Sequence, residues 1–381
     1  MERIYLDHAA TTPVHPDVMK AVMATMETNF GNPSSIHSYG REARKQLNEA
    51  RARLAASIHA KDNEIIFTSG GTEADNYAII GTALARKQKG KHMITTEIEH
   101  HAVLHTFNTL EKQGFEVTYL PVDETGRINI ENLRDALRED TILVSVMFGN
   151  NEVGAVQDVQ GIGELLEGHQ AYFHTDAVQA YGAIAIDVKE LKVDMLSVSS
   201  HKINGPNGVG FLYCREGVQL HPIMFGGEQE RKRRAGTENL PGIAGFAEAS
   251  KIAEEKLAER QETYKMFRVA MLNIFSEGNI SFDVNGTMEH TLPHILNVSF
   301  PGTNVEAMLV NLDLAGIAAS SGSACTAGSI DPSHVLVSMY GKGHEKTTNS
   351  IRFSFGLYNT VEDIEKAAHE TVKIVKRLTK Q

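Results

Sequence analysis

The sequence predicts an α/β protein with a mixed, mostly parallel seven-stranded sheet that carries helices on both faces, together with a smaller α+β domain. Through the first two-thirds of the chain, short runs typical of strands alternate with helical patterns, and most intervals are long enough for a helical crossover. Only seven residues, however, separate the sixth run from the seventh. Because that interval is too short for a parallel crossover, we expect the last strand of the sheet to run antiparallel.

The expected strands of the sheet are, in chain order, 64–68, 92–96, 116–122, 141–148, 171–176, 195–200 and 208–214. Helical patterns over 41–58 and 73–90 supply two of the covering helices. Leu47, Leu54 and Ile58 lie on one side of the first of these helices. We therefore expect that side to pack into the core.

The pattern changes near residue 250, where the smaller domain is expected. Its elements are a long charged helix over 257–275, strands at 294–300 and 350–355, and a closing helix near 361–379. Because chain ends often fold together, we predict a large domain over residues 16–250 and a small domain made of residues 1–15 and 251–381.

Composition excludes several classes of protein. Lys and Arg total 37 against 48 Asp and Glu, and the formal net charge of −11 disfavours a broad nucleic-acid footprint. Two cysteines cannot form a disulfide framework, and no uncharged apolar run of about 18 residues occurs. The N-terminus turns polar at once, so we expect no signal peptide. We therefore expect a cytoplasmic protein that binds neither nucleic acid directly nor a membrane.

The stretch TSGGTEA, residues 68–74, follows an expected strand and opens a helix. Glycines let backbone N–H groups approach a ligand and a helix N-terminus favours an anion, so Gly71 and Thr72 could hold a phosphate. The stretch has neither the P-loop spacing nor the dinucleotide spacing. A glycine turn with Thr72 as the helix cap is an equally good interpretation.

Two ionisable residues follow strand-like runs at the edge where open α/β sheets bind ligands. Lys202, in SSHKINGPNG, could form a Schiff base with a carbonyl cofactor, or could be an ordinary surface lysine in a hairpin. Asp176, in HTDAVQ, could pair with a protonated pyridine nitrogen, or could serve as a helix N-cap.

His100 and His101 follow the expected strand at 92–96, where one imidazole could lie over a flat ring. Adjacent histidines also suggest a metal, but neighbours on a helix point in different directions and no third ligand follows at a suitable spacing. We therefore expect no metal site.

The two cysteines have different surroundings. Cys325, in ASSGSACTAGS, has small neighbours that leave its sulfur reachable, whereas Cys214, in GVGFLYC, is expected in the core. A thiol with a pKa of about 8.5 is mostly protonated near pH 7, so Cys325 needs a nearby base or cation to act as a nucleophile.

Arg352 interrupts an apolar alternation in SIRFS. Its guanidinium could clamp a substrate carboxylate bidentately, or could belong to a partly buried ion pair. The basic run at 231–234 is typical of a solvated loop or a local phosphate contact in so acidic a chain.

Together these motifs resemble the cysteine desulfurases of the NifS/IscS type, in the class-V aminotransferase family, and the serine-rich stretch before Cys325 resembles the first of their two groups. The resemblance extends over nearly the whole chain, through YLDHAATTP, GNPSSIHSYG, TSGGTEADN, EHHAVL, NNEVGAVQ, HTDAVQ, SSHKINGPNGVG, RRAGTEN, SSGSACTAGS and SIRFSFG, in that order.

The resemblance implies a fold-type I transferase that depends on pyridoxal 5′-phosphate. It gives Lys202 two roles, covalent binding of the cofactor and transfer of the substrate Cα proton. At the ring of the cofactor it implies Asp176 at the pyridine nitrogen, His100 stacked on the ring, and Gln179 and Asn151 near the ring oxygen. At the phosphate it implies Gly71, Thr72, Ser199 and His201, together with Thr237 from the other subunit of a homodimer.

For the substrate, the resemblance implies a carboxylate site made of Arg352, Asn32 and Asn151, with Cys325 as the sulfur acceptor. The implied reaction converts L-cysteine into L-alanine and leaves a persulfide on Cys325, which then passes to an iron–sulfur scaffold or a tRNA-thiolating enzyme. A selenocysteine lyase, or another pyridoxal-phosphate lyase or aminotransferase, is the alternative enzyme. A non-catalytic sulfur carrier is the alternative from another class, and an intact Lys202 argues against it.

Overall fold

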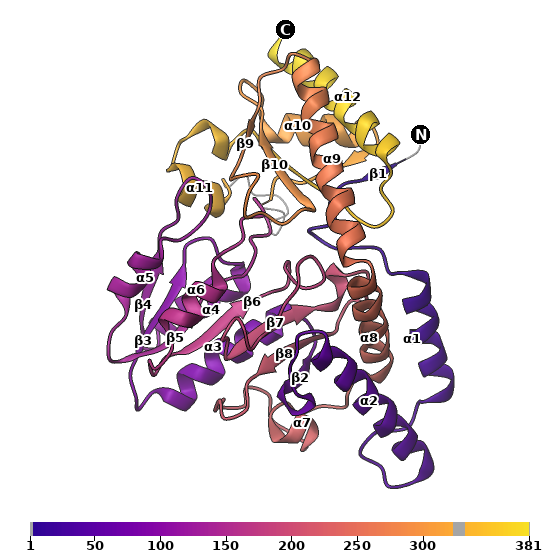
Figure 1. Ribbon diagram of the computed structural model, residues 1–381, viewed down its shortest axis with the longest axis vertical. Coiled ribbons are helices and arrows are strands. Elements are labelled where there is room, and N and C mark those ends of the chain that lie inside the picture. The colour runs from indigo at the N-terminus through magenta and orange to yellow at the C-terminus, as the bar shows by residue number, and fades with distance from the viewer. Residues whose placement is uncertain (1–2, 323–331, 381) are drawn as a thin grey trace.

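A seven-stranded sheet forms the centre of the computed structural model, which describes residues 3–322 and 332–380 (Figure 1). Its strands follow the order β2 (Ile65–Thr68), β8 (Gly210–Cys214), β7 (Met195–Ser199), β6 (Tyr172–Asp176), β5 (Thr141–Ser145), β3 (His92–Thr96) and β4 (Glu116–Leu120). Every pair from β7 to β4 is parallel, whereas β8 runs antiparallel to both of its neighbours. The predicted mixed sheet, with an antiparallel last strand, is confirmed.

Strand ends differ from the prediction by a few residues. The fourth run was expected to reach residue 148 but β5 ends at Ser145, and the third was expected to reach 122 but β4 ends at Leu120. The next residue after β4 is Pro121, which has no N–H to donate to a ladder. Pattern alone does not locate such ends.

Helices cover both faces of the sheet, as predicted. Alternate residues of each strand point to opposite faces, so Ile66 and Leu212 join one hydrophobic cluster while Phe67 and Phe211 join the other. The first face is covered by α3 (Gly71–Arg86) and α4 (His101–Glu111). The second is covered by α2 (Ser38–Ala56), α5 (Ile130–Ala136), α6 (Val159–Leu165) and α8 (Leu240–Glu255).

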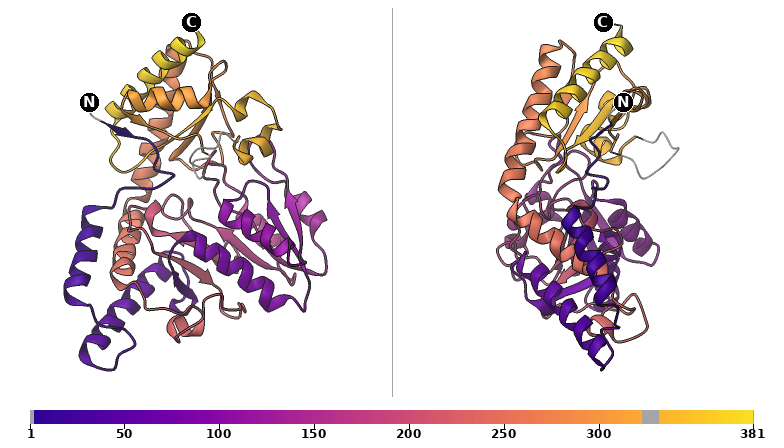
Figure 2. Two further views of the ribbon diagram at one scale, coloured as in Figure 1. Left: turned by 180° about the vertical axis from the view of Figure 1, so that it is seen from behind. Right: turned by 90° about the vertical axis from the view of Figure 1, so that its right-hand side faces the viewer.

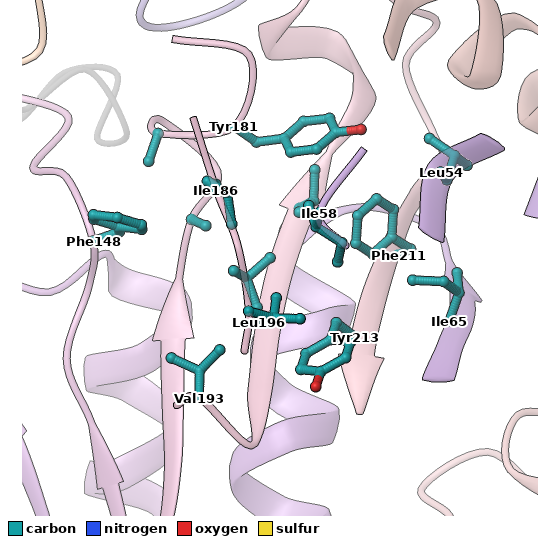
Figure 3. Close-up of a cluster of buried hydrophobic side chains, with 14 of the residues drawn as sticks. Leu54, Ile58, Ile65, Phe148, Tyr181, Ile186, Val193, Leu196, Phe211 and Tyr213 are labelled. Carbon is teal, nitrogen blue, oxygen red and sulfur yellow. The ribbon is translucent and has the colours of Figure 1, made fainter. Parts of the chain in front are cut away.

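Figure 3 shows the second of these clusters, where Tyr181, Leu196 and Phe211 gather over the strands. Phe211 stacks on Phe246 of α8 with 5.6 Å between ring centroids. The expected apolar side of the early helix lies here, because Leu47, Leu54 and Ile58 are fully buried in this cluster.

A second layer lies above the sheet in Figure 1 and contains both ends of the described chain. A three-stranded antiparallel sheet pairs β12 (Ser350–Ser354) with β10 (Ile295–Ser299) and β10 with β9 (Asp283–Val284). Three helices pack against it in one hydrophobic cluster, α9 (Leu257–Glu277), α10 (Val305–Leu314) and α12 (Val361–Thr379). In both views of Figure 2, α9 runs from the level of the large sheet up into this layer.

The first residues of the chain belong to this second layer. A short parallel pair joins β1 (Ile4–Tyr5) to β11 (Ile317–Ala318), and Leu6 is buried in the same cluster as α12. We propose the two layers as the large and small domains, with the boundaries at residues 15 and 250. The remaining helices are α1 (Pro16–Thr28), α7 (Gln229–Lys232) and α11 (His334–Tyr340).

Candidate active site

A cavity of about 280 Å³ lies at the carboxyl edge of the seven-stranded sheet. The last residue of β6, Asp176, and the last residue of β7, Ser199, both line it, and so does Arg352 from the second layer. Most of the residues predicted from the sequence meet here, namely Gly71, Thr72, His100, Asn151, Asp176, Gln179, Ser199, His201, Lys202 and Arg352.

One end of the cavity is the N-terminus of α3. Gly70 is the N-cap residue with φ of 151°, a conformation that favours glycine, and Gly71 begins the helix. A Cβ atom on Gly71 would lie 2.6 Å from Cγ2 of Val178, so this position has no room for a side chain. The interpretation of Thr72 as the helix cap is wrong, because Thr72 lies inside the first turn and lines the cavity. Backbone amides and hydroxyls at a helix N-terminus suit a phosphate.

Lys202 lies just beyond β7, and it is not an ordinary surface lysine. Its Nζ donates to the carbonyl oxygen of Ala10 over 2.6 Å and also to that of Ala9. The neighbouring His201 contacts Thr11 through Nδ1 at 3.1 Å, and burial together with the charge of Lys202 lowers the pKa of His201 to about 4. The N-terminal segment therefore holds the lysine end of the cavity.

A pair of buried carboxyl groups lies on the sheet side. Burial raises the pKa of Asp176 to about 6, although the amide of Val178 donates to its Oδ1 over 2.9 Å. Asp75, the fifth residue of α3, is buried, and both desolvation and the nearby Asp176 raise its pKa. Two adjacent buried carboxyl groups cannot both ionise readily, so a cation placed against Asp176 would be strongly stabilised.

His100 presents a neutral imidazole to the cavity. It is the N-cap of α4, and its Nδ1 accepts a hydrogen bond from the amide of Ala102 over 3.1 Å. Burial, followed by the charge of Lys202, lowers the pKa of His100 to about 4. Because Nδ1 accepts in the neutral ring, Nε2 carries the proton.

Arg352 is buried, with 2% of its surface exposed. Its Nη2 pairs with Oδ1 of Asp7 over 2.7 Å, and Nη1 donates to the backbone carbonyl of Asn151 over 2.7 Å. Nε is also buried and has no hydrogen-bond partner among residues 3–322 and 332–380. The interpretation of Arg352 as part of a buried ion pair is confirmed, and its role at a substrate carboxylate stays a prediction.

Gln179 connects the lysine to the second layer. Its Nε2 donates to the carbonyl oxygen of Ala9 over 2.9 Å, and its Oε1 lies 3.3 Å from Nε2 of His294. Ala9 therefore accepts from both Gln179 and Lys202. This shared acceptor fixes the two side chains relative to each other.

Two of the predicted site residues, Asn32 and Thr237, do not line this cavity. Asn32 has an exposed side chain whose Oδ1 accepts from the amide of Ser34 over 2.8 Å, and Thr237 is also exposed. Cys325 lies outside the described residues. Cys214 is buried in β8, where desolvation raises its pKa to about 12, so the expectation of a core thiol is confirmed.

The basic run at 231–234 is only partly solvated. Arg231 and Lys232 are exposed, whereas Arg234 pairs with Glu73 on the first turn of α3 over 2.7 Å. Just before the run, the buried Glu230 pairs with Arg51 of α2 over 2.6 Å. The run is therefore attached to the cavity side of α3 and to the core.

The chain on either side of residues 323–331 is fixed at the cavity. Ser320 exchanges backbone hydrogen bonds with Arg352, at 3.1 and 2.6 Å, and Gly322 lines the cavity. After the gap, the Ser333 hydroxyl donates to the carboxylate of the buried Glu152.

Sequence reasoning missed several contributors. Asp7, Asp75 and the carbonyl oxygens of Ala9 and Ala10 had no predicted role, although the motifs YLDHAATTP and TSGGTEADN contain all four residues. A chain segment that acts through its backbone carbonyls leaves no side-chain signal. The carboxylates could have been suspected from their place in those motifs.

The donors of this cavity fit pyridoxal 5′-phosphate. The glycine cradle at the start of α3 suits the phosphate, the buried Asp176 suits a protonated pyridine nitrogen, and Lys202 suits the aldehyde. Among the described residues no group of three or more His, Cys, Asp and Glu side chains could hold a metal ion, and no helix is long and apolar enough to cross a membrane.

Comparison with known proteins agrees with this chemistry. The family described as Aminotransferase class-V matches residues 4–367. A Bacillus subtilis (strain 168) protein named putative cysteine desulfurase IscS 1 is 60% identical over all of both chains. The structure of a NifS-like protein has a TM-score of 0.92 and 35% identity, covering 99% of this chain and 100% of its own. A structure titled SspA in complex with cysteine has a TM-score of 0.82 and 35% identity, covering 94% of this chain and 100% of that one.

The fold and the cavity thus define a fold-type I enzyme that depends on pyridoxal 5′-phosphate. Within that class, the chain belongs to the class-V aminotransferase family and to its cysteine desulfurases of the IscS and NifS type.

Proposed function

We propose that this enzyme removes sulfur from L-cysteine, releases L-alanine and holds the sulfur as a persulfide on Cys325. One observation carries the proposal, which is that Lys202, Asp176, His100 and Arg352 line one cavity whose rim includes Gly322, three residues before Cys325. The identity to proteins named cysteine desulfurase and the cysteine complex of SspA support L-cysteine as the substrate.

The residues at the start of α3, with Ser199 and His201, would hold the cofactor phosphate, and Asp176 would hold the pyridine nitrogen. Lys202 would bind the cofactor covalently. When bound, the cofactor withdraws electrons from the α- and β-carbons of the substrate and so weakens its bond to sulfur.

The remaining steps belong to side chains of this chain. Arg352 would bind the substrate carboxylate through its free Nε, which orients the amino acid. Lys202 Nζ would then take the proton from Cα, while the N–H of His100 Nε2 stabilises charge near the ring.

Cys325 would receive the sulfur. Its thiolate forms a bond to the substrate sulfur, the bond between Cβ and sulfur breaks, and the electron pair stays on carbon, which takes a proton. The cysteine thiol is oxidised to a persulfide while Cβ is reduced to the methyl group of alanine, so no external oxidant is needed.

A pair of cysteine variants tests the proposal. Cys325→Ala should keep the cofactor on Lys202, detected by mass after borohydride reduction, but should form neither alanine nor persulfide from L-cysteine. Cys214→Ala is the matched control, because its thiol is buried in β8, and it should keep both products. Full alanine and sulfide release by Cys325→Ala would contradict the assignment. A wild-type protein that takes up no pyridoxal 5′-phosphate would contradict the proposed function as a whole.

A homodimer would complete the site, with Thr237 supplied to the phosphate of the other subunit. Two features support it. One is the exposure of Thr237 on a segment fixed by the Arg234 pair, and the other is a set of exposed apolar side chains on α1, on the loop after it and at the start of α2. These are Met19, Met23, Met26, Phe30, Ile36 and Tyr39.

Ultracentrifugation tests the dimer. Met23→Glu should dissociate the protein and lower its cofactor affinity, whereas Val310→Glu, on the exposed side of α10, should do neither. A monomeric wild-type protein with full activity would overturn this part of the proposal.

The persulfide would pass to an iron–sulfur scaffold or a tRNA-thiolating enzyme in the cytoplasm, where a reducing medium keeps Cys325 free. Incubation with ³⁵S-cysteine and each purified acceptor tests this step, because the label should move from Cys325 to only one of them. Retention of the label on Cys325 with both acceptors would exclude both.

A further inference from the structure

A second, smaller cavity lies behind Lys202, between the large sheet and α9. Its volume is about 40 Å³, and Gln179 and Lys202 are the residues that it shares with the cofactor cavity. This volume accommodates a water-sized group or a small ion but neither an amino acid nor the cofactor.

Arg260 of α9 forms one wall of this second cavity. The residue is 9% exposed, and its Nε and Nη2 atoms are buried with no hydrogen-bond partner in the described parts of the chain. The adjacent Glu259 is directed elsewhere, because it pairs with Lys256 over 2.7 Å. A guanidinium stays protonated when buried, and a buried charge without a counter-charge is strongly unfavourable.

The other walls supply no negative charge. None of the described residues that line the second cavity is an aspartate or a glutamate. Burial lowers the pKa of His8 to about 4 and that of His294 to about 3, so both rings are neutral, while burial raises the pKa of Tyr264 and keeps its hydroxyl protonated. The second cavity thus offers positive charge and unpartnered donors from Arg260.

We propose that the second cavity binds one small monovalent anion of the size of chloride, held by Nε and Nη2 of Arg260. A monatomic ion fits better than sulfate or phosphate, whose four oxygens need more donors than one guanidinium edge provides. Two sources share this chemistry, a halide from the solvent and hydrosulfide, which an external thiol releases from the Cys325 persulfide while that thiol is oxidised to a disulfide. Only the second source rests on the proposed function.

The site connects the two layers directly behind the cofactor lysine. Arg260 belongs to the helix that runs into the second layer, whereas Gln179 and Lys202 belong to the edge of the large sheet. An anion here neutralises Arg260 and lies in a cavity that shares Gln179 and Lys202 with the cofactor cavity. Its occupancy therefore stabilises the folded holoenzyme, because the unfolded chain has no such site.

Bromide is the probe for the experiment. Crystals of the holoenzyme grown in sodium bromide should show an anomalous bromine peak beside Arg260 Nε. In solution, bromide and chloride should raise the unfolding temperature saturably, compared with gluconate at equal ionic strength, which is too large to enter.

Arg260→Gln should remove the peak and lower the apparent halide affinity at least about tenfold. Arg268→Gln is the matched control, because Arg268 is a buried arginine on the same helix that does not line the cavity, and it should keep both signals. No bromine peak in the wild-type holoenzyme, or an unchanged halide response in Arg260→Gln, would overturn the proposal.

Competition distinguishes the two sources. Displacement of the bromine peak by hydrosulfide at a concentration where chloride leaves it in place assigns the sulfur source, and displacement by chloride first assigns the solvent halide. Diffraction and unfolding measurements need no turnover. They can therefore refute the anion site while the proposed desulfurase activity stands, and an activity assay can refute the activity while the anion site stands.

Discussion

Replacement of Arg352 by glutamine is expected to lower kcat/KM for L-cysteine by about 10- to 150-fold while the cofactor stays bound. The buried guanidinium is anchored by Asp7 and by the carbonyl of Asn151, and its Nε has no hydrogen-bond partner among the described residues. Glutamine keeps a polar group near this place but removes the charge.

The magnitude follows from the contact that is lost. A hydrogen bond to a charged group contributes about 1.5–3 kcal/mol, and 1.4 kcal/mol corresponds to about tenfold, which gives the range above. Asp7→Asn is the matched control, because it removes the ion-pair partner over 2.7 Å and keeps the charge of Arg352. We expect a smaller loss there.

The assay compares L-cysteine with cysteamine, which lacks the carboxylate. Wild-type enzyme should strongly prefer L-cysteine, and Arg352→Gln should lose most of that preference by losing activity on L-cysteine alone. Equal losses on both substrates, or loss of the cofactor from the variant, would refute the reasoning, since Arg352 would then support the fold rather than bind the carboxylate.

Three further predictions concern the cofactor end and the core. In the cofactor-free protein, folding raises the pKa of Asp176 from 3.8 to about 6. The protein should therefore lose about 3 kcal/mol of unfolding free energy as pH rises from about 4 through about 6. Asp176→Asn should flatten this part of the curve of unfolding free energy against pH, and an unchanged curve would exclude this carboxyl as the cause. Gly71→Ala should weaken cofactor binding about tenfold or more in a fluorescence titration, because its Cβ would lie 2.6 Å from Cγ2 of Val178. Adding Val178→Ala should restore binding, and a double variant that binds as weakly as Gly71→Ala would contradict the clash. Arg51→Met leaves Glu230 buried without its partner and should lower the free energy of unfolding in urea by about 3–5 kcal/mol. The double variant that also carries Glu230→Met should recover most of this loss, and a double variant as unstable as Arg51→Met would contradict the argument.

The sheet could be predicted because its signal is local. Each strand is a short apolar run, and the short interval before Gly210–Cys214 determines the direction of β8. The two-residue strands β1 and β11 could not be predicted, since their pairing of Ile4 with Ile317 depends on chain positions far apart. Helix α1 was not predicted either, and only Val18 and Thr25 of its residues are buried.

The site could be predicted where side chains carry the chemistry. Lys202, Asp176, His100 and Arg352 were found from residue type and position, and the structure brings all four to one cavity. The backbone carbonyls of residues 9 and 10 could not be found, because any residue type supplies the same acceptor. Arg260 was missed for another reason, since an arginine in a charged helix gives no sign of burial.

The N-terminal segment has a consequence for synthesis of the protein. Asp7 binds Arg352, and Leu6 accepts a backbone hydrogen bond from Ser354, so this segment gains partners that are synthesised 345 residues later or more. Ala9 and Ala10, whose carbonyl oxygens accept hydrogen bonds from Lys202 Nζ, follow directly on this segment. A nascent chain that already contains Lys202 therefore lacks a completed cofactor pocket. We expect the cofactor to bind only after residues 352–354 have been synthesised and have folded against the N-terminal segment.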